Sequence, residues 1–229
     1  MKDIYLFGTS TTSSRVKSFI DYHHLFIIKA FVIDDDFLND KWFENHPVIS
    51  MSDFKNIPDY ENLNIFICIA WNNLNSDRKT VFNNLSAANL NLVNLISPTA
   101  IVRGQITGRN VFVGDGVGLE VGSEIDDNVF IDHHVFVGTN TKIEKHAYLG
   151  AKSMIAGEVT IGTQSFIGIS ATVFDQVSIG DKSIISGGEV IKRNVKRCSV
   201  IKSTADAQHS TAYSEEEIIH KLVVKKNVR

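Results

Sequence analysis

Apolar positions recur every six residues through the second half of the chain. From Ile101 to Lys196 the sequence divides into sixteen consecutive six-residue units without an insertion, and the first residue is aliphatic in fifteen of them, Thr107 being the exception. A period of six is three times the period of a β-strand and does not fit the 3.6-residue period of an α-helix. We therefore expect short strands that turn a corner every six residues, three of which close one coil of eighteen residues.

The other positions of each unit agree with this geometry. The fifth residue is small or valine in every unit except those that contain Gln105 and Glu189. Glycine, aspartate and asparagine gather at the second to fourth positions, where tight corners need unusual backbone dihedrals. The pattern predicts a parallel β-helix over residues 95–200.

The pattern changes to alternating strands and helices before the repeats. Strand, helix and strand in alternation are typical of a doubly wound α/β unit, so we expect a small, Rossmann-like parallel sheet over residues 1–94. A tail over 201–229 begins where the period stops, and Ser214 followed by Glu217 predicts a capped helix from Glu215 to about Val224. The expected elements of the α/β unit are strands at Ile4–Gly8, 27–36, Asn64–Trp71 and 91–96, and helices at Ser13–Tyr22 and Ser76–Asn84.

Composition narrows the class of protein. The chain is 43% hydrophobic with a formal net charge of -3, and it lacks the basic excess that marks nucleic-acid binding. Cys68 and Cys198 adjoin apolar runs, so we expect two reduced thiols. The N-terminus does not resemble a signal peptide, and no stretch is long and apolar enough to span a membrane. A cytoplasmic protein is the expectation.

Three segments with polar side chains follow expected strands. The loop after the first strand holds Gly8, Thr9, Ser10 and Thr12, and backbone amides at a helix start can bind phosphate. The run 34–36, with Asp34 and Asp35, follows the second strand and could accept hydrogen bonds from a ribose or base, and Asn72 follows the strand at Asn64–Trp71. Because ligands bind at the carboxyl ends of parallel strands, we expect the three segments to converge, although a capping loop and an acidic turn are equally good explanations of the first two.

Three histidines lie within the repeats. Imidazole can act as a general base near neutral pH, which makes His133, His134 and His146 candidates. In a coil of eighteen residues the first two share one corner and His146 lies at another, so they could meet only across a subunit interface. An exposed or structural role is the competing explanation for each of them. Their spacing does not match a three-histidine zinc site, so no metal is expected.

The whole arrangement resembles the nucleotide-sugar N-acyltransferases, similar to the bacterial acetyltransferases of the bacillosamine, perosamine and sialic acid pathways. This resemblance implies a left-handed β-helix, a homotrimer, acetyl-CoA as acyl donor and co-substrate, and a nucleotide-linked amino sugar as acceptor, for lipopolysaccharide or glycan synthesis. The segments that carry it are IYLFGTSTTSSRV, FVIDDDF, FICIAWNN, LISPTAIV and AGEVTIGTQSFIGISATV.

The resemblance also implies roles for individual residues. The segment from Gly8 to Ser13 corresponds to the loop that holds the pyrophosphate, and Asp34 and Asp35 to the residues that hold the base. Gly157 corresponds to the glycine whose amide binds the thioester carbonyl, and such an amide can stabilise an oxyanion. The acyl-CoA contacts implied are Gly157, Gly168 and Lys202.

The chain departs from the family where the catalytic base is expected. The family's catalytic histidine falls on Thr139, the acidic residue after it on Asn140, and a second family histidine on Tyr148. The usual Asn-Thr pair is replaced by Asp132 and His133. The family's C-terminal G-x-P-A segment is replaced by IKSTADA.

These departures leave several hypotheses. His134, or secondarily His133, acts as the base from a neighbouring corner; or a free amine attacks the thioester without one; or the chain has lost activity and binds nucleotide sugars only. A different acyl group or O-acylation of a hydroxyl is a further alternative, although a hydroxyl needs a base more than a free amine does.

Overall fold

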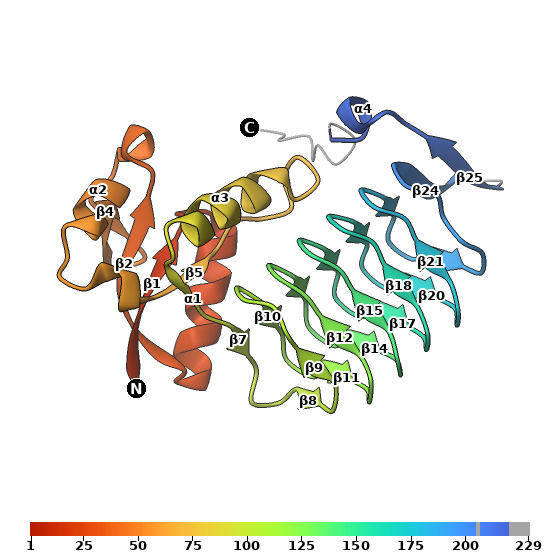
Figure 1. The fold of residues 1–229 in the computed structure, drawn as a ribbon, viewed down its shortest axis with the longest axis horizontal. Helices are drawn as coiled ribbons and strands as arrows, with labels where there is room; N and C mark the ends of the chain where they lie inside the picture. Colours follow the sequence, from red (N-terminus) through yellow and green to blue (C-terminus); the bar gives the residue numbers. More distant parts are fainter. Residues whose placement is uncertain (205–206, 220–229) are drawn as a thin grey trace. The chain divides into compact units, whose positions relative to one another are not determined.

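The computed structural model describes residues 1–204 and 207–219 of the chain, which form two compact units (Figure 1). The first comprises Met1–Ala70 and Thr80–Leu95. The second comprises Trp71–Lys79 and the chain from Ile96 onward. A nine-residue segment inside the sequence of the first unit therefore belongs structurally to the second. The division of function between residues 1–94 and 95–200 stays a prediction.

The first unit is built on a six-stranded sheet with the order β3-β4-β2-β1-β5-β6. All neighbouring strands are parallel except the pair β3 and β4, so the predicted α/β architecture is confirmed. The strands are β1 (Lys2–Phe7), β2 (Phe26–Ile33), β3 (Trp42–Phe43), β4 (His46–Ser50), β5 (Asn64–Ile67) and β6 (Asn91–Leu92), and the helices are α1 (Thr11–His23), α2 (Met51–Lys55) and α3 (Ser76–Ala87), with 3-10 turns at Asp35–Phe37 and Tyr60–Asn62.

Helix α1 buries Val16, Phe19 and Ile20, the face that the sequence predicted. The strand expected over Asn64–Trp71 is wrong at its end, because β5 stops at Ile67. Trp71 instead packs on aromatic rings of the second unit. The expected strand over 91–96 is two short strands, β6 and β7 (Leu95–Ile96), which belong to different sheets. Strands β3 and β4 and helix α2 were not predicted.

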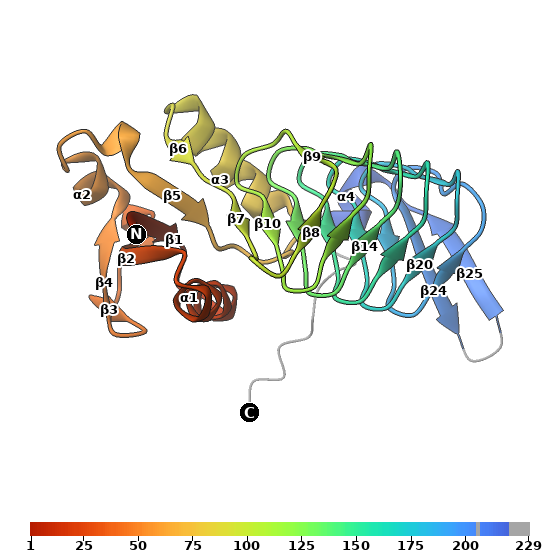
Figure 2. The same cartoon turned by 90° about the horizontal axis from the view of Figure 1, so that it is seen from below.

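The second unit is a parallel β-helix with three faces (Figure 2). We name the faces by their outward side chains as aromatic, apolar and polar. The aromatic face holds β7, β10 (Phe112–Val113), β13 (Phe130–Ile131), β16 (Tyr148–Leu149), β19 (Phe166–Ile167), β22 (Ile184–Ile185), β24 (Ser199–Thr204) and β25 (Ala207–Ala212); the apolar face holds β8 (Ile101–Val102), β11 (Gly118–Leu119), β14 (Phe136–Val137), β17 (Met154–Ile155), β20 (Thr172–Val173) and β23 (Val190–Ile191); the polar face holds β9 (Gln105–Ile106), β12 (Glu124–Ile125), β15 (Lys142–Ile143), β18 (Thr160–Ile161) and β21 (Ser178–Ile179).

Strand residues from Phe112 to Ile191 pair with residues eighteen positions away, as the period predicts, whereas the first coil and strand β24 pair at spacings of 16 to 19. Phe112 pairs with Phe130 on the aromatic face, and Glu124 pairs with Lys142 on the polar face. From Val113 onward, the aliphatic first position of each six-residue unit points inward and forms one continuous core, buried through to Ile185, whereas Ile101 in the first unit is exposed. Burying this column of aliphatic side chains is the main driving force for stacking the coils.

Residues 71–79 cover part of the aromatic face. The ring of Trp71 lies 4.8 Å from that of Tyr148, and the guanidinium of Arg78 lies 5.8 Å above Phe130. Arg78 also donates hydrogen bonds to the carbonyl oxygens of His146 (3.0 Å) and Ala147 (3.2 Å). Outward aromatic side chains on this face are thereby buried within the protein's own chain.

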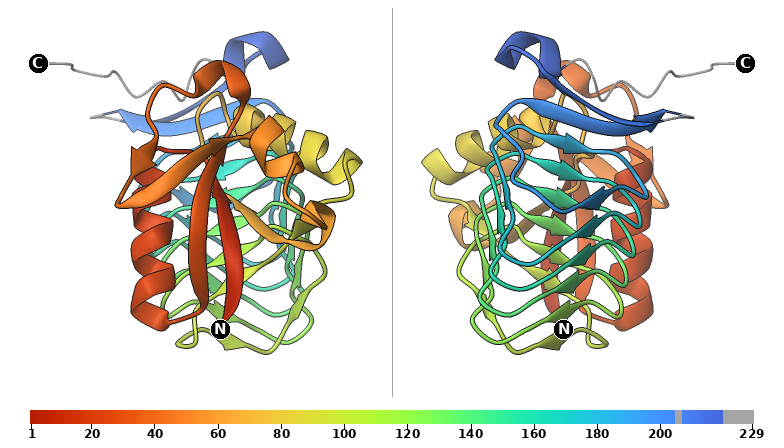
Figure 3. Two further views of the ribbon diagram at one scale, coloured as in Figure 1. Left: turned by 90° about the vertical axis from the view of Figure 1, so that its left-hand side faces the viewer. Right: turned by 90° about the vertical axis from the view of Figure 1, so that its right-hand side faces the viewer.

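The coils end in the antiparallel hairpin β24–β25 and in helix α4 (Glu215–Ile219), which Figures 1 and 3 place together. Ser214 caps α4 as predicted, with its hydroxyl accepting a hydrogen bond from the amide of Glu217. The rest of the predicted helix, to Val224, lies outside the described residues. None of the helices in the described part of the chain combines the length and apolar character that a bilayer crossing demands.

Candidate functional site

The corners of the β-helix stack into three edges, which we name the Gly157, histidine and Gln164 edges. The Gly157 edge joins the apolar and polar faces, the histidine edge joins the aromatic and apolar faces, and the Gln164 edge joins the polar and aromatic faces. Their corners are 138–140, 156–158, 174–176 and 192–194 for the Gly157 edge; 114–116, 132–134, 150–152 and 168–170 for the histidine edge; and 126–128, 144–146, 162–164 and 180–182 for the Gln164 edge.

A repeated contact ties successive corners together. The middle amide of a corner donates a hydrogen bond to a side chain eighteen residues later, in the next coil, which satisfies a backbone group that the strands leave unpaired. The pairs are Arg109 with Asp127 (3.0 Å), Asp115 with His133 (2.9 Å), Gly157 with Asp175 (3.0 Å) and Thr163 with Asp181 (3.0 Å).

Gly157 is a glycine that the fold itself does not demand. A Cβ added there would lie 3.3 Å from the carbonyl oxygen of Thr139, and the residue does not have a positive φ. By contrast, a Cβ on Gly138 would lie 2.5 Å from the next coil's backbone, and one on Gly168 would lie 2.4 Å from the amide of Gly187. The two other glycines are required by stacking, whereas a Cβ at Gly157 would make a tight contact that a small shift relieves.

A groove of about 500 Å³ opens at Gly157. Its wall includes Thr139, the position where the resemblance expects a histidine, together with the carboxylates of Glu158 and Asp175. A side-chain oxygen of Glu158 accepts a hydrogen bond from Gln176 at 3.1 Å. The amide of Gly157 is directed at Asp175, so an acidic side chain occupies the donor that the resemblance assigns to a thioester carbonyl.

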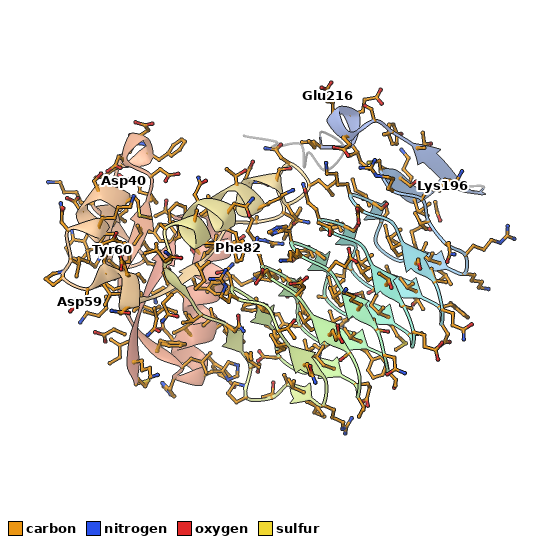
Figure 4. All side chains as sticks on the ribbon, viewed as in Figure 1. Asp40, Asp59, Tyr60, Phe82, Lys196 and Glu216 are labelled. Carbon is orange, nitrogen blue, oxygen red and sulfur yellow. The ribbon has the colours of Figure 1, made fainter. Side chains whose placement is uncertain are left out.

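Positive charge collects two coils further along the same edge. A second groove, of about 700 Å³, is lined by Lys192, Arg193 and Lys196, and Figure 4 shows Lys196 at the C-terminal end of the coils. Strands in neighbouring coils lie about 4.8 Å apart, so this groove begins about 10 Å from Gly157 along the edge. The edge therefore offers a backbone donor at one end and cations at the other.

His133 and His134 lie on the histidine edge and line neither groove. Nδ1 of His133 accepts the hydrogen bond from Asp115, so the neutral ring carries its proton on Nε2, and that nitrogen lies 3.7 Å from Asp132. Nδ1 also lies 3.4 Å from a carboxylate oxygen of Asp115, so both ring nitrogens have polar neighbours in their own protomer. His134 is exposed and has a positive φ of 58°.

His146 lies on the Gln164 edge and is buried there. Its Nδ1 is 2.9 Å from the side-chain amide nitrogen, Nδ2, of Asn128. Desolvation, followed by the charges of Arg78 and Lys79, lowers the pKa of His146 to about 4. A neutral, buried imidazole packed by its own chain has the structural role that the sequence left open for it.

The loop after β1 lies where the strand order of the α/β sheet reverses, between β1 and β5. Gly8 has a φ of 114°, which only glycine adopts without strain. Ser10 begins α1, and its amide donates to Ser13 at 3.0 Å, while both hydroxyls are within 3.4 Å of the carbonyl oxygen of Cys68. Thr9 is exposed and Thr12 is half-buried beside this helix start.

The acidic run after β2 is only partly free. Asp35 accepts hydrogen bonds from the amide (3.3 Å) and the hydroxyl (3.0 Å) of Ser52 at the start of α2. Hydrogen bonds from Ser50 and Ser52 lower the pKa of Asp35, whereas burial and the adjacent carboxylates raise that of Asp34. Asp34 is therefore the carboxylate more available to a ligand.

The remaining sequence candidates are scattered. Asn72 is exposed and belongs to the second unit, whereas Gly8 and Asp34 belong to the first, so the expected convergence applies within the α/β unit to two segments only. Lys202 is exposed on β24. Among the described residues, no three histidine, cysteine, aspartate or glutamate side chains are grouped as metal ligands would be.

Sequence reasoning missed Asp175, although a signal for it is present. Asp175 stands at the third position of its six-residue unit, as Gly157 does, exactly one coil later. An acidic residue one coil after a glycine corner is therefore placed to accept from that glycine's amide. The position of the cations Lys192 and Arg193, two coils beyond Gly157 on the same edge, was also not predicted.

Solved structures share this fold over almost the whole chain. A variant of perosamine N-acetyltransferase from Caulobacter crescentus, in complex with CoA and GDP-perosamine, matches 93% of this chain and 98% of its own with a TM-score of 0.80 at 22% identity. The acetyltransferase domain of PglB from Neisseria gonorrhoeae, in complex with acetyl coenzyme A, matches 88% and 96% with a TM-score of 0.77 at 19% identity. WeeI from Acinetobacter baumannii matches 92% and 100% with a TM-score of 0.78 at 16% identity.

Comparisons of the sequence match a shorter part of the chain than comparisons of the structure do. The model of the hexapeptide repeat of succinyl-transferase matches residues 158–193. A search of curated proteins finds no match. The predicted architecture is thus confirmed: an α/β unit followed by a left-handed β-helix, the fold that these solved structures share.

Proposed function

We propose that this protein is an N-acyltransferase that moves an acetyl group from acetyl-CoA to the amine of a nucleotide-linked amino sugar, in the synthesis of a surface polysaccharide such as lipopolysaccharide. The solved structure that matches it at a TM-score of 0.80 holds CoA and GDP-perosamine. Two free, buried thiols, Cys68 and Cys198, fit the reducing cytoplasm as the place of this reaction.

The observation that carries the proposal is the Gly157 edge. The backbone amide of Gly157, which donates to Asp175 in the first groove, and the cations of Lys192 and Arg193 lie on one edge, two coils apart, and Lys196 lines the second groove with them. Acyl-CoA carries its thioester and its phosphates at opposite ends of a flexible pantetheine arm. We place the thioester at Gly157 and the phosphates at the cations, and retain Gly168 and Lys202 as further coenzyme contacts.

The amide of Gly157 supplies the electrostatic part of the chemistry. When the amine attacks the carbonyl carbon of the thioester, negative charge develops on the carbonyl oxygen. A backbone N–H held by the β-helix can donate to that oxygen without reorganising, which is how an oxyanion is stabilised. The proton acceptor for the attacking amine then has to lie close to the same groove.

The α/β unit is proposed to hold the nucleotide. The start of α1, a helix of thirteen residues, presents the amide of Thr12 beside the strand-order reversal, while that of Ser10 donates to Ser13. Helix starts of this kind bind phosphates, and Thr9 adds an exposed hydroxyl. Asp34 is proposed to accept hydrogen bonds from the base or ribose, with Asp35 and Asn72 as secondary contacts.

We further propose a homotrimer that associates through the apolar face. Of the three faces, the aromatic one is partly covered by residues 71–79 and the polar one carries Glu124 and Lys142. The apolar face leaves Phe136, Met154 and Val190 exposed by 38%, 54% and 45%. Three copies with this face toward a threefold axis bring the histidine edge of one copy beside the Gly157 edge of the next.

Two groups then compete for the amine proton. His134 of a neighbouring copy would reach the groove in the trimer, with His133 less suited because its ring nitrogens are engaged. Asp175 already lies in the groove.

The test is a transfer assay with the purified protein. Acetyl-CoA is incubated with a panel of nucleotide-linked amino sugars, release of the CoA thiol is followed, and acetylation of the acceptor is established by its mass. We expect turnover with at least one amino sugar, and none with the matched sugars that carry a hydroxyl in place of the amine. Replacing Arg193 by Glu is expected to raise KM for acetyl-CoA about tenfold or more, because it reverses a phosphate-binding charge.

The alternatives give different outcomes in the same assay. Turnover with hydroxy sugars favours O-acylation, and faster turnover with a longer acyl-CoA identifies another acyl group. Thermal stabilisation by nucleotide sugars but not by CoA, without turnover, would show a binding protein in place of an enzyme.

A further inference from the structure

The groove at Gly157 contains its own candidate for moving a proton. Among the described residues that line it, only Glu158 and Asp175 carry ionisable side chains. Glu158 is engaged by Gln176, whereas one oxygen of Asp175 accepts from the Gly157 amide at 3.0 Å and its side chain is exposed to the groove. We propose that Asp175 is the proton acceptor of the acyl transfer, held on the Gly157 amide until the thioester oxygen replaces it there. This inference rests on the proposed function.

The single N–H of Gly157 cannot donate at full strength to the Asp175 carboxylate and to the thioester oxygen at the same time. The single hydrogen of Gly157 N–H is directed at the carboxylate of Asp175 in the groove, so the amide stabilises a negatively charged oxygen there. A developing oxyanion makes the same demand on the donor. Arrival of the thioester therefore releases Asp175 within the groove at the moment when an acceptor for the amine proton is needed.

Reach distinguishes Asp175 from the histidines. The amine must lie about 3–3.5 Å from the carbonyl carbon, and a base must lie about 2.6–3.2 Å from the amine. A base that serves a carbonyl bound at Gly157 therefore lies within a few ångströms of that amide. Asp175 meets this condition within one protomer, whereas His134 lies on a different edge.

The proton and electron pairs balance along this path. The amine nitrogen attacks the carbonyl carbon, a C–N bond forms, and the carbonyl π electrons move to the oxygen held by Gly157. Asp175 takes the proton that the nitrogen becomes acidic enough to lose. Collapse of the intermediate breaks the C–S bond, and the leaving thiolate takes the proton back from Asp175, giving the amide product, CoA thiol and the original carboxylate.

A structural role is the competing explanation, and the fold provides a matched control for it. Asp181 accepts from the amide of Thr163 at 3.0 Å on the Gln164 edge, which is the same corner contact outside the groove. If stacking were the whole purpose of Asp175, replacing either aspartate by asparagine would have the same effect. Asparagine keeps an oxygen that can accept from the amide and loses the ability to take a proton.

The experiment compares Asp175→Asn, Asp175→Ala, Asp181→Asn and His134→Ala with the wild-type protein. Rates of acetyl transfer are measured across pH, and thermal unfolding is measured for each. We expect both Asp175 variants to lose about 10²-fold or more in kcat, with Asp175→Asn unfolding at the same temperature as Asp181→Asn. Asp181→Asn is expected to stay within threefold of wild-type kcat, and the loss for His134→Ala is expected to be much smaller than that for either Asp175 variant. Added formate is expected to restore part of the activity of Asp175→Ala, which a merely structural role would not allow.

The failures are distinguishable. A wild-type protein that transfers acetyl groups while Asp175→Asn keeps kcat within threefold overturns the assignment and leaves the proposed function intact. A loss of kcat confined to His134→Ala moves the base to the neighbouring copy's histidine edge and also overturns it. Absence of transfer by the wild-type protein with every amino-sugar acceptor removes both proposals together.

Discussion

Two faces of the same β-helix carry apolar outward side chains, and the chain treats them differently. On the aromatic face, Trp71 covers the ring of Tyr148 and Arg78 covers that of Phe130, and Leu74 is buried further along the same face beside Ile184. On the apolar face, Met154 and its neighbours along the strands stay exposed in the protomer. The six-residue repeat produces both apolar faces, but it does not determine which of them is covered by other parts of the chain. The covered face therefore contributes to protomer stability, and the uncovered face is available for association between copies.

The sharpest test of this difference is a charge on the apolar face. Met154→Glu is expected to break the proposed trimer, because three copies would bring like charges together at the axis. Juxtaposed like charges cost several kcal/mol, and about 4 kcal/mol lowers association about 10³-fold. Analytical ultracentrifugation should report a molecular mass falling from three chains to one.

The matched control for that experiment is Thr160→Glu. Thr160 lies in the same coil, one face further along, on the polar face. We expect this variant to keep the wild-type mass. Dissociation by Thr160→Glu and not by Met154→Glu would assign the interface to the polar face, and a wild-type protein that sediments as a monomer would remove the trimer.

Leu74→Ala tests how much the covering residues 71–79 contribute to the free energy of unfolding. Leu74 is fully buried in a cluster with Ile184, Val200 and Ile218. Truncating a buried leucine leaves a cavity, and the expected loss in the free energy of unfolding is about 3 kcal/mol. Urea denaturation measures it, with Leu38→Ala as the control, since Leu38 is 38% exposed and surface truncations change stability by about 0.5 kcal/mol or less. A loss below about 1 kcal/mol for Leu74→Ala would mean that residues 71–79 contribute little to this unit.

The coils could be predicted from the sequence because their information is local and periodic. The inward position recurs every six residues, so the register of Phe112 on Phe130 follows from counting alone. The segment at 71–79 could not be placed this way. Trp71 continues an apolar run, and only the three-dimensional neighbours Tyr148 and Phe166 explain why the chain leaves the sheet after Ile67.

The residues of the candidate site also divide into those that local sequence predicts and those that depend on how the coils stack. Gly157 could be singled out because it stands in a recognisable segment, and the structure adds that stacking does not require a glycine there. Asp175 was missed because its contact spans one complete coil and depends on how corners stack. His133 appeared as a candidate base from its chemistry alone, but its Nδ1 is engaged by the backbone of the coil before it. Residue type suggested the chemistry, whereas the coil geometry determined which atoms are available.

The smallest expected effect concerns the boundary of the covered face, where His146 packs beside residues 71–79. The pKa of this imidazole is lowered to about 4, by burial first and then by Arg78 and Lys79, while Asp127 opposes the shift and Lys145 adds to it. In the unfolded chain the imidazole is protonated below about pH 6.5, whereas in the folded chain it is protonated only below about pH 4. The free energy of unfolding therefore falls as the pH is lowered through this window. Between pH 7 and pH 5 the expected loss from this one group is about 2 kcal/mol. His146→Asn, which tolerates the positive φ of 63°, should flatten the pH profile of the free energy of unfolding by that amount. Parallel profiles for the two proteins between pH 5 and pH 7 would show that the imidazole titrates normally, and that this end of the covered face admits water.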